Sequence, residues 1–374
     1  MKKSIILLCI IGCALQAVAQ KETRFLVQFR HKGGTAFSLA NSTQFLSSKA
    51  VARRSRYNIA VDSTDVPVPQ VFLDSLRAIP GVQVLNVSRW LNSAAVFVAD
   101  SAARARVQAL PFIHSFQAIA GTQAPTTRPD ATLSNNFYTS TTIATTDTFY
   151  RYGLTAAQIN IHNGAFLHNL GLQGQGMTVG MLDAGFQNYL TVSGFDSVRR
   201  KGQIKDRWDF VASDSNVNND HGHGTACFSV IAGNLPGQFV GSAPAASFHL
   251  YRTEDVFTEF PIEELNWVCA AERLDSAGGD VISSSLGYMF YDSTYMSYRY
   301  EDLNGNRTIA SRGADLAAKK GLLVVNAAGN YGASTTYKYI MTPADGDSVL
   351  AVGQIDTVGV IGVHSSWGPS ADGR

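Results

Sequence analysis

Three side chains in this sequence have the types and positions needed for acid–base chemistry. Asp183 ends the apolar run Thr178–Asp183, which has the composition of a buried strand. His223 opens a stretch of small and apolar residues typical of a helix, and Asn330 ends a second buried-strand pattern over Gly321–Asn330. A carboxylate can orient a histidine, a histidine can act as a general base, and an amide can donate a hydrogen bond to an oxyanion.

Alternating strand and helix patterns predict the scaffold that holds these groups. Ser247–Arg252 and Asp280–Gly287 have strand patterns, and Pro261–Ala277 between them has a helical pattern. This alternation predicts an α/β fold, with a parallel sheet covered by helices on both faces. Open parallel sheets place their active sites at the carboxyl ends of the strands, which is where Asp183 falls.

The order of these motifs resembles that of the subtilisin-like serine proteases, or subtilases. The resemblance rests on the strand ending in Asp183, on Asp220-His221-Gly222-His223-Gly224-Thr225, and on Ala327-Ala328-Gly329-Asn330. It implies that Asp183 holds His223, that His223 is the general base, and that Asn330 binds the oxyanion.

Two positions depart from the family pattern. Ala184 follows the aspartate where the family more commonly has Ser or Thr, and Ala226 replaces the second histidine of His-Gly-Thr-His. Neither position belongs to the triad, so the implied roles stand.

The nucleophile of the family does not occur in this sequence. Subtilases carry it in Gly-Thr-Ser at the start of a long helix, downstream of the oxyanion asparagine. The last residues, Ser365–Arg374, resemble the family segment just before that serine. We therefore expect a serine endopeptidase whose serine lies beyond Arg374, and a 374-residue chain that is inactive alone. The alternative is a non-catalytic peptide-binding pseudoprotease.

Further family segments imply how a substrate would bind. The segment matching Ser285-Leu286-Gly287 is the edge along which a polypeptide substrate lies extended, so backbone groups hold it by β-augmentation. Ala328 and Gly329 would face this edge across the pocket for the residue before the scissile bond, the P1 residue. Small walls favour a sizeable apolar P1 side chain.

Metal sites were weighed against these roles. His221 and His223 suggest a metallohydrolase as an alternative. However, His-Gly-His lacks the helical i, i+4 spacing of zinc ligands, and no third ligand group stands out in the sequence. We therefore expect no catalytic metal. Asp302–Asn306 places oxygen-bearing side chains around a glycine, as calcium loops do, but lacks the terminal glutamate. We expect a solvated turn there; no cofactor is required, and a structural calcium stays open.

Composition and the N-terminus indicate an exported globular protein. The 374 residues are 45% hydrophobic and 16% charged, enough for a large core. Lys2-Lys3, the apolar run Ile5–Ile11 and a small-residue site at Ala19 predict a signal peptide over residues 1–19 and secretion, because the run is too short to span a bilayer. A lipobox ending at Cys13 is the alternative.

Charge is distributed unevenly along the chain. Between Lys21 and Ala120 there are 12 Lys and Arg against 5 Asp and Glu, whereas between Ala131 and Arg374 there are 15 against 23. The formal net charge of +1 gives no reason to expect nucleic acid as a partner. The opposite signs instead predict that the two parts attract each other.

Residues 20–120 have the pattern of a separate α+β domain. Its rhythm of strands and helices resembles the ferredoxin-like, inhibitor-like propeptide of subtilases, which would be a partner of the protease; an unrelated accessory domain is the alternative. Near its end, Phe112, Ile113 and Phe116 are expected to contact the protease or lie along Ser285–Gly287. The expected elements are strands at Phe25–Phe29, Val82–Val87, Ala94–Val98 and Ile113–Ile119, and helices at Thr43–Arg56, Val71–Ala78 and Ser101–Leu110.

Gly121–Thr148 is rich in Thr, Ser, Ala, Asn and Pro and has no apolar periodicity. We therefore expect a linker that holds the processing site, followed by the subtilase domain over residues 149–374.

Within the subtilase domain, Ala156–Leu170 is predicted as a helix and Tyr288–Tyr300 as a hairpin. Outside the signal, the cysteines are Cys227 and Cys269, and we expect buried free thiols rather than a disulfide.

Overall fold

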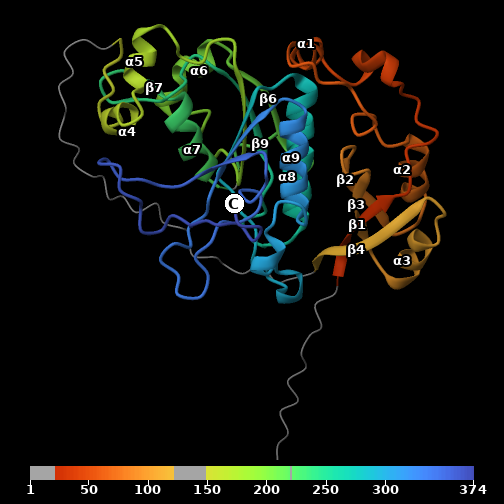
Figure 1. The fold of residues 1–374 in the computed structure, drawn as a ribbon. Helices are drawn as coiled ribbons and strands as arrows, with labels where there is room; N and C mark the ends of the chain where they lie inside the picture. The colour runs from red at the N-terminus through yellow and green to blue at the C-terminus, as the bar shows by residue number, and fades with distance from the viewer. Residues whose placement is uncertain (1–21, 122–148, 220) are drawn as a thin grey trace, which may run out of the picture.

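The computed structural model describes residues 22–121, 149–219 and 221–374 (Figure 1). The expected signal peptide, the alternative lipobox and nearly all of the expected linker lie outside these residues. Two domains are visible: an N-terminal domain of residues 22–121 and a C-terminal domain of residues 149–374. No helix within the described ranges is long and apolar enough to cross a membrane.

The N-terminal domain is a four-stranded antiparallel sheet with the order β2-β3-β1-β4. This strand order is that of the ferredoxin-like fold, as predicted, and the β-α-β-β-α-β succession is that of the same fold once α1 is taken as an additional helix before α2. Each expected element is present, with the long first helix reduced to its second part. The elements are β1 Glu22–Phe29, α1 Ser48–Arg56, α2 Gln70–Arg77, β2 Val82–Ser88, β3 Ser93–Val98, α3 Ser101–Gln108 and β4 Ile113–Gly121.

The C-terminal domain is built on a six-stranded sheet with the order β12-β11-β10-β5-β9-β6, in which every pair is parallel. Its strands are β5 Thr178–Asp183, β6 Ile204–Asp209, β9 Ser247–Arg252, β10 Val281–Ser284, β11 Leu323–Ala327 and β12 Val349–Val352. Helices cover both faces, which confirms the predicted α/β class. They include α6 Asp196–Arg200 and α7 His223–Ala232 on one face and α8 Ile262–Ala277 and α9 Ile309–Lys319 on the other.

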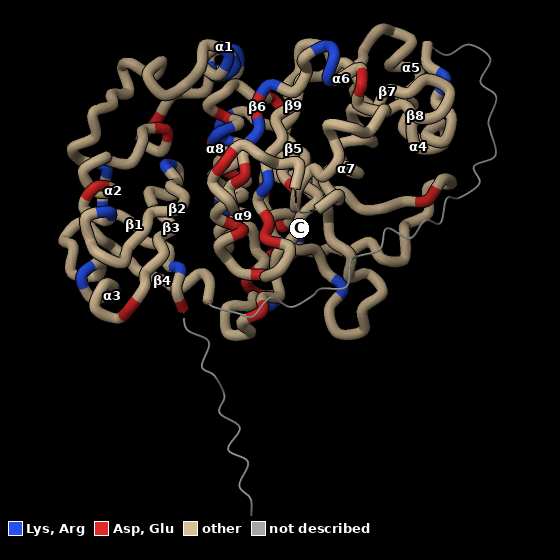
Figure 2. The backbone as a smooth tube through the Cα atoms, turned by 180° about the vertical axis from the view of Figure 1, so that it is seen from behind, with Lys and Arg blue, Asp and Glu red and all other residues tan. Residues whose placement is uncertain are grey.

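The helix α8 lies between the two sheets and belongs to a core that both domains share. Trp267 is fully buried and donates a hydrogen bond from Nε1 to Ser284 Oγ at 2.9 Å. Trp90 and Ile119 of the N-terminal domain pack into the same cluster of buried side chains. Acidic residues are frequent along α8, which holds Glu263, Glu264, Glu272 and Asp275, and Figure 2 shows Asp and Glu positions along this helix.

Two expectations about local structure in the C-terminal domain were wrong. The expected helix 156–170 is two short helices, α4 Ala156–Asn160 and α5 Gly164–Asn169, because Asn163 adopts the left-handed region at φ 55°. The Tyr288–Tyr300 segment holds 3₁₀ turns at Thr294–Met296 and Tyr300–Asp302, not a hairpin.

Phe112, Ile113 and Phe116 do not face the C-terminal domain. The Phe112 ring stacks on Phe72 with centroids 4.2 Å apart, and Phe116 stacks on Phe25 at 4.4 Å. Ile113 is buried in the same N-terminal core. Their apolar surface is therefore used inside their own domain, and the expectation that they contact the protease or its substrate edge was wrong.

Candidate active site

Asp183 lies at the carboxyl end of β5, and the first turn of α7, which follows β6 in the chain, packs against this strand end. All six residues of the strand are buried, and the Asp183 side chain is 1% exposed. Its Oδ1 accepts a hydrogen bond from the Ala184 backbone N–H at 2.8 Å. Its Oδ2 is buried and has no hydrogen-bond partner among the described residues. A carboxylate held in this way is well placed to orient a neighbouring donor.

His223 is the first residue of α7, and its Nδ1 lies 2.7 Å from Asp183 Oδ1. Its side chain is 38% exposed, so one side of the ring faces the carboxylate while the rest remains accessible. The hydrogen bond with Asp183 raises the pKa of the His223 imidazole above its ordinary value, with a smaller contribution from Cys227 and an opposing one from burial. The buried carboxylate thus stabilises the imidazolium form.

Gly224 makes this contact geometrically feasible. A Cβ atom at this position would lie 2.4 Å from the Gly185 carbonyl oxygen and 2.9 Å from Asp183 Cβ. Only glycine therefore lets the first turn of α7 lie this close to the end of β5. His221 supports the same turn, because its Nδ1 accepts a hydrogen bond from the His223 backbone N–H at 3.1 Å.

Cys227 lies one helical turn after His223, with Sγ 3.8 Å from Nδ1 and 4.0 Å from Nε2. Asp183, His223 and Cys227 present ligand atoms within 4.8 Å of one another, a grouping that could hold a metal ion. His221 is not part of this grouping. The i, i+4 spacing of His223 and Cys227 is visible in the sequence, so this neighbour could have been found there. Both described cysteines are free as predicted, but Cys227 is half-buried rather than buried.

Asn330 lies three residues after the end of β11, at the same edge of the sheet, and is exposed. The backbone beside it is fixed, because Ser366 donates from its N–H to the Gly329 carbonyl at 2.9 Å and accepts from the Tyr331 N–H at 3.0 Å. Gly329 has a φ of 115°, which favours glycine. The structure joins Asp183 to His223 directly and places Asn330 at their edge without a hydrogen bond to either.

The predicted substrate edge follows β10 directly. Ser285, Leu286 and Gly287 are half-buried, and the Leu286 carbonyl accepts a hydrogen bond from Asn326 Nδ2 at 2.9 Å. Gly287 makes no backbone hydrogen bond to another described residue. Its polar groups are thus available for an added strand.

Met341 lies between the two predicted walls of the P1 pocket. A Cβ on Gly287 would be 3.3 Å from the Met341 sulfur, and a Cβ on Gly329 would be 3.1 Å from it. Met341 is 8% exposed, and its N–H donates to the Ala328 carbonyl at 3.2 Å. The Met341 side chain therefore occupies space between Gly287 and Gly329 that these two glycines, having no side chains, would otherwise leave open.

A buried carboxyl group that sequence reasoning missed lies just beyond the end of β9. Glu254 accepts hydrogen bonds from Tyr288 Oη at 2.7 Å and from Thr253 Oγ1 at 2.6 Å. Burial raises the pKa of Glu254 to about 8. Thr253 also donates its backbone N–H to the Asp183 carbonyl at 3.0 Å, which ties this segment to the site.

At the loop weighed as a calcium site, protein donors hold the first carboxylate. Asp302 Oδ2 accepts from the Arg299 N–H at 2.9 Å, and its Oδ1 pairs with Arg307 at 2.8 Å. Asn304 Oδ1 accepts from the Asn306 N–H at 3.1 Å. These contacts are those of a hydrogen-bonded turn.

Comparison with known proteins identifies relatives of both domains. Residues 24–134 match the peptidase S8 propeptide domain of Bacteroidota, and residues 174–374 match the subtilase family. Thermitase from Thermoactinomyces vulgaris is 29% identical over 205 residues, which cover 54% of this chain and 62% of thermitase. A cuticle-degrading serine protease from Arthrobotrys oligospora is 28% identical over 200 residues, covering 53% of this chain and 42% of that protein.

Among solved structures, that of the prenylagaramide maturation protease PagA aligns at a TM-score of 0.38 and 22% identity over 52% of this chain and 59% of that chain. The chain spans less than two thirds of the length of the two curated relatives it matches. The subtilase match covers more than half of the 374 residues. The chain therefore belongs to the subtilase family, and its N-terminal antiparallel sheet is a peptidase S8 propeptide domain.

Proposed function

We propose that this chain is part of the precursor of a secreted serine endopeptidase that hydrolyses polypeptides with an Asp-His-Ser triad. Asp183 and His223 are two members of the triad, and the serine is supplied by sequence that follows Arg374. Membership of the subtilase family supports serine peptidase chemistry. The single observation that carries the assignment is the 2.7 Å contact between His223 Nδ1 and the buried Asp183 carboxylate at the carboxyl edge of the sheet.

In this mechanism the serine hydroxyl attacks the scissile carbonyl while His223 Nε2 takes its proton. Asp183 keeps the proton of the imidazole on Nδ1 and stabilises the imidazolium that forms. The Asn330 amide donates a hydrogen bond to the oxyanion of the tetrahedral intermediate. His223 then returns the proton to the leaving amine. The substrate lies extended along Ser285-Leu286-Gly287, and Ala328 and Gly329 form the facing wall.

A chain extended through the downstream serine tests these roles. His223→Ala and Asp183→Asn should each lower kcat/KM for a peptide substrate by at least about 10³-fold, because the base is lost or held wrongly. His162→Ala removes an exposed histidine of the segment between α4 and α5 and should leave activity unchanged. Near-normal activity of His223→Ala, with a folded protein, would overturn the triad assignment.

Inhibitors separate this proposal from its two rivals. A serine-directed phosphonate should stop the extended enzyme, whereas a chelator should not. The opposite pattern would support a metallohydrolase, for which Asp183, His223 and Cys227 are the available ligands. Binding of peptides without turnover in the extended chain would support the pseudoprotease.

The N-terminal domain and the leader have proposed roles in processing and export. Residues 1–19 direct secretion, and the extended precursor cuts itself within Gly121–Thr148, whereas the 374-residue chain stays intact because it has no nucleophile. Mass spectrometry of both purified proteins checks the cleavage, and the N-terminus of the exported protein checks the leader. A self-generated new N-terminus in the 374-residue chain would contradict the proposal.

A further inference from the structure

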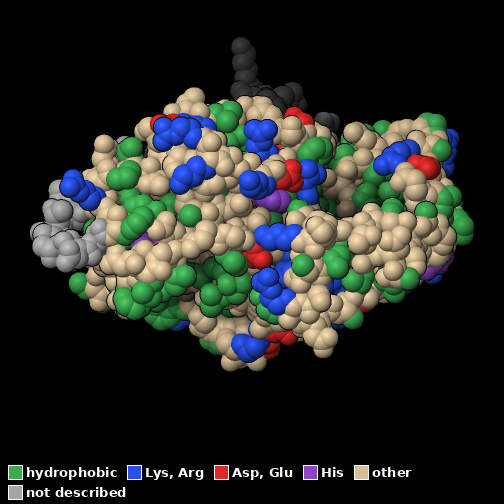
Figure 3. Space-filling view, turned by 90° about the horizontal axis from the view of Figure 1, so that it is seen from above, with side chains coloured by type: hydrophobic (Ala, Val, Ile, Leu, Met, Phe, Trp, Pro, Cys, Tyr) green, Lys and Arg blue, Asp and Glu red, His purple; other side chains and the backbone are tan. Residues whose placement is uncertain are grey.

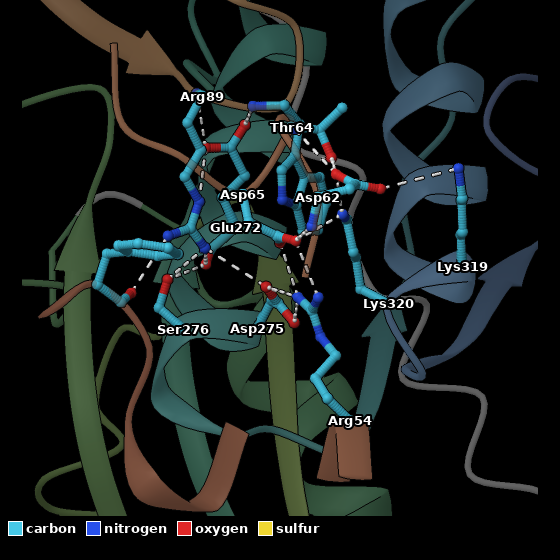
Figure 4. A network of polar contacts seen from close by, with 12 residues as sticks. Arg54, Asp62, Thr64, Asp65, Arg89, Glu272, Asp275, Ser276, Lys319 and Lys320 are labelled. Carbon is cyan, nitrogen blue, oxygen red and sulfur yellow. Dashed lines mark hydrogen bonds and ion pairs between the residues drawn. The ribbon is translucent and has the colours of Figure 1, made fainter. Parts of the chain in front are cut away.

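A cluster of mostly buried charged side chains lies where the two domains meet. The N-terminal domain contributes residues from α1 and from the segments after α1 and β2, and the C-terminal domain contributes residues near the ends of α8 and α9 (Figure 4). We call this set the interdomain charge cluster. Its members are Arg53, Arg54, Asp62, Asp65, Arg89, Glu272, Asp275 and Lys320.

Arg54 bridges the domains through two carboxylates. Its Nη1 and Nη2 donate to the two oxygens of Asp65, in its own domain, at 3.1 and 2.9 Å. The same Nη2 donates to Asp275 of α8 at 2.9 Å. The Arg54 side chain is 2% exposed, and both carboxylates are fully buried. Arg53 also donates to Asp275, so two guanidinium groups of α1 meet one carboxylate.

At Lys320 the charges are arranged the other way round: the cation belongs to the C-terminal domain and the carboxylates belong to the N-terminal domain. This lysine follows α9 in the C-terminal domain, and its side chain is 1% exposed. Its Nζ donates to Asp62 Oδ1 at 2.8 Å and to Asp65 Oδ2 at 2.9 Å, both in the N-terminal domain. Cations of the first domain thus meet an anion of the second, while anions of the first meet a cation of the second. This alternation fixes a register, which a uniform attraction between a basic and an acidic surface does not.

Glu272 completes the pattern one turn before Asp275. Its carboxylate accepts hydrogen bonds from Ser88 Oγ at 2.5 Å and from the backbone N–H groups of Arg89 and Trp90 at 2.9 and 3.1 Å. Every described hydrogen-bond or ion-pair partner of the side chains of Glu272, Asp275 and Lys320 therefore lies in the N-terminal domain. The C-terminal domain buries three charges that it does not itself satisfy.

We propose that the interdomain charge cluster is a recognition site through which the C-terminal domain selects its own N-terminal domain. A domain of the same fold that lacked Arg53, Arg54 and Arg89 and the two aspartates would leave Asp275 and Lys320 desolvated and unpaired. Such groups are strongly unfavourable, so the cluster rejects wrong partners as well as holding the right one. This inference rests on the proposed role of residues 22–121 as a propeptide, but its test needs no peptidase activity.

An exposed ion pair at the edge of the same junction gives a contrast within the chain. Lys49 of α1 pairs with Asp280 at 2.8 Å, but the lysine side chain is 43% exposed. Figure 3 shows Lys and Arg side chains gathered in a band across the middle of the face seen from above, in contact with solvent. Exposed pairs of this kind contribute little because water and salt screen them. Selection therefore depends on the buried pairs.

The test measures how long the cut domains stay together. A recognition sequence for a site-specific protease is placed within residues 122–148 of the full chain, the folded protein is immobilised through its C-terminal end, and the protease is added. Loss of the N-terminal domain is then followed over time. Asp275→Asn and Lys320→Met should each speed dissociation at least about 100-fold, because the first leaves Arg53 without its carboxylate partner and the second removes a buried cation from Asp65. Both changes lie in the C-terminal domain and remove no described side-chain contact within it.

A double-mutant cycle tests pairwise recognition. Arg54→Met combined with Asp275→Asn should dissociate more slowly than the product of the two single effects predicts, by about 10-fold or more. Arg77→Met, which removes an exposed arginine whose one ion-pair partner among the described residues is Asp74, and Lys49→Met should each change the rate less than about 5-fold. Rates for Asp275→Asn and Lys320→Met equal to these controls would overturn the proposal. If the double variant dissociates at the rate that the product of the two single effects predicts, Arg54 and Asp275 act independently, and the cluster is a set of unrelated structural contacts and not a recognition site.

Discussion

Gly224 sets the distance between α7 and β5, and changing it to alanine is the most direct test of how the site is held. The added Cβ would lie 2.4 Å from the Gly185 carbonyl oxygen, 2.9 Å from Asp183 Cβ and 3.0 Å from the Phe186 ring. Ordinary contact begins near 3.4 Å, so the first turn of α7 must move by about 1 Å. Backbone atoms form part of the obstacle, so no single side chain can turn away to relieve it.

That movement has two consequences of known size. Overpacking costs about 1–3 kcal/mol, and the better helix propensity of alanine returns at most about 1 kcal/mol, so we expect a loss of about 1–2 kcal/mol in the free energy of unfolding. A displacement of about 1 Å would also lengthen the His223–Asp183 contact from 2.7 Å to beyond hydrogen-bonding distance. The pKa of His223 should then fall towards the ordinary value of 6.5.

Chemical denaturation and an NMR titration of His223 in the 374-residue chain measure both effects. Gly222→Ala is the matched control, because a Cβ there meets nothing within 4 Å and the residue has a φ of −90°. The control should leave the His223 pKa raised. If Gly224→Ala also keeps a raised pKa and native stability, the close approach of helix and strand is not what holds the pair.

Four further outcomes are expected. Because the pKa of His223 is raised in the folded state, its contribution to the free energy of unfolding is complete below pH 6.5 and is lost as pH rises through the folded pKa. Denaturation curves across pH should show this fall in stability for the wild type and not for Asp183→Asn. Burial raises the pKa of Glu254 from 4.5 to about 8, so wild-type stability should fall as pH rises across this window, and Glu254→Gln should flatten the fall. In the cut protein, higher salt should slow reassociation of the domains, since exposed charges are screened over about 8 Å at 0.15 M, while dissociation changes little. Met341→Ala should raise kcat/KM of the extended enzyme for large relative to small P1 residues, and an unchanged preference would remove Met341 from the pocket wall.

The Asp183–His223 pair was predictable because its signals are local. A buried strand ending in a carboxylate and a glycine-flanked histidine at a helix start determine where each side chain lies, and a parallel sheet brings strand ends to one edge. Met341 and Glu254 were not predictable in this way. Each reaches the site only through tertiary packing, and neither lies in a segment whose pattern indicates chemistry.

Two elements that sequence analysis missed, β6 and α9, have weak apolar patterns. The strand β6 has the sequence Ile-Lys-Asp-Arg-Trp-Asp and lies at the edge of the sheet, where one side remains open and charges are tolerated. The helix α9 is rich in alanine and contains Gly313, whose missing side chain lets it pack closely on Val268 of α8. Small residues produce close helix packing without the large apolar side chains that a periodicity search detects.

The interdomain charge cluster shows that net charge can predict that two domains associate but not which contacts hold them together. The opposite charges of the two parts predicted attraction, and the domains do lie together. The contacts that fix their register, however, alternate in sign and are buried, and Arg53 meets Asp275 across 222 positions of sequence. In isolation Ser48–Arg56 has the pattern of a solvated basic helix, because nothing local reveals an acidic partner so far along the chain.

The helix α8 connects the segment behind the candidate site to the interdomain charge cluster. Near its start, Glu263 accepts hydrogen bonds from the backbone N–H groups of Asp255 and Phe260, and so shapes the segment that follows Glu254. Near its end, Asp275 is satisfied only by arginines of the N-terminal domain among the described residues. One rigid element therefore carries both the loop behind the site and the recognition of the N-terminal domain.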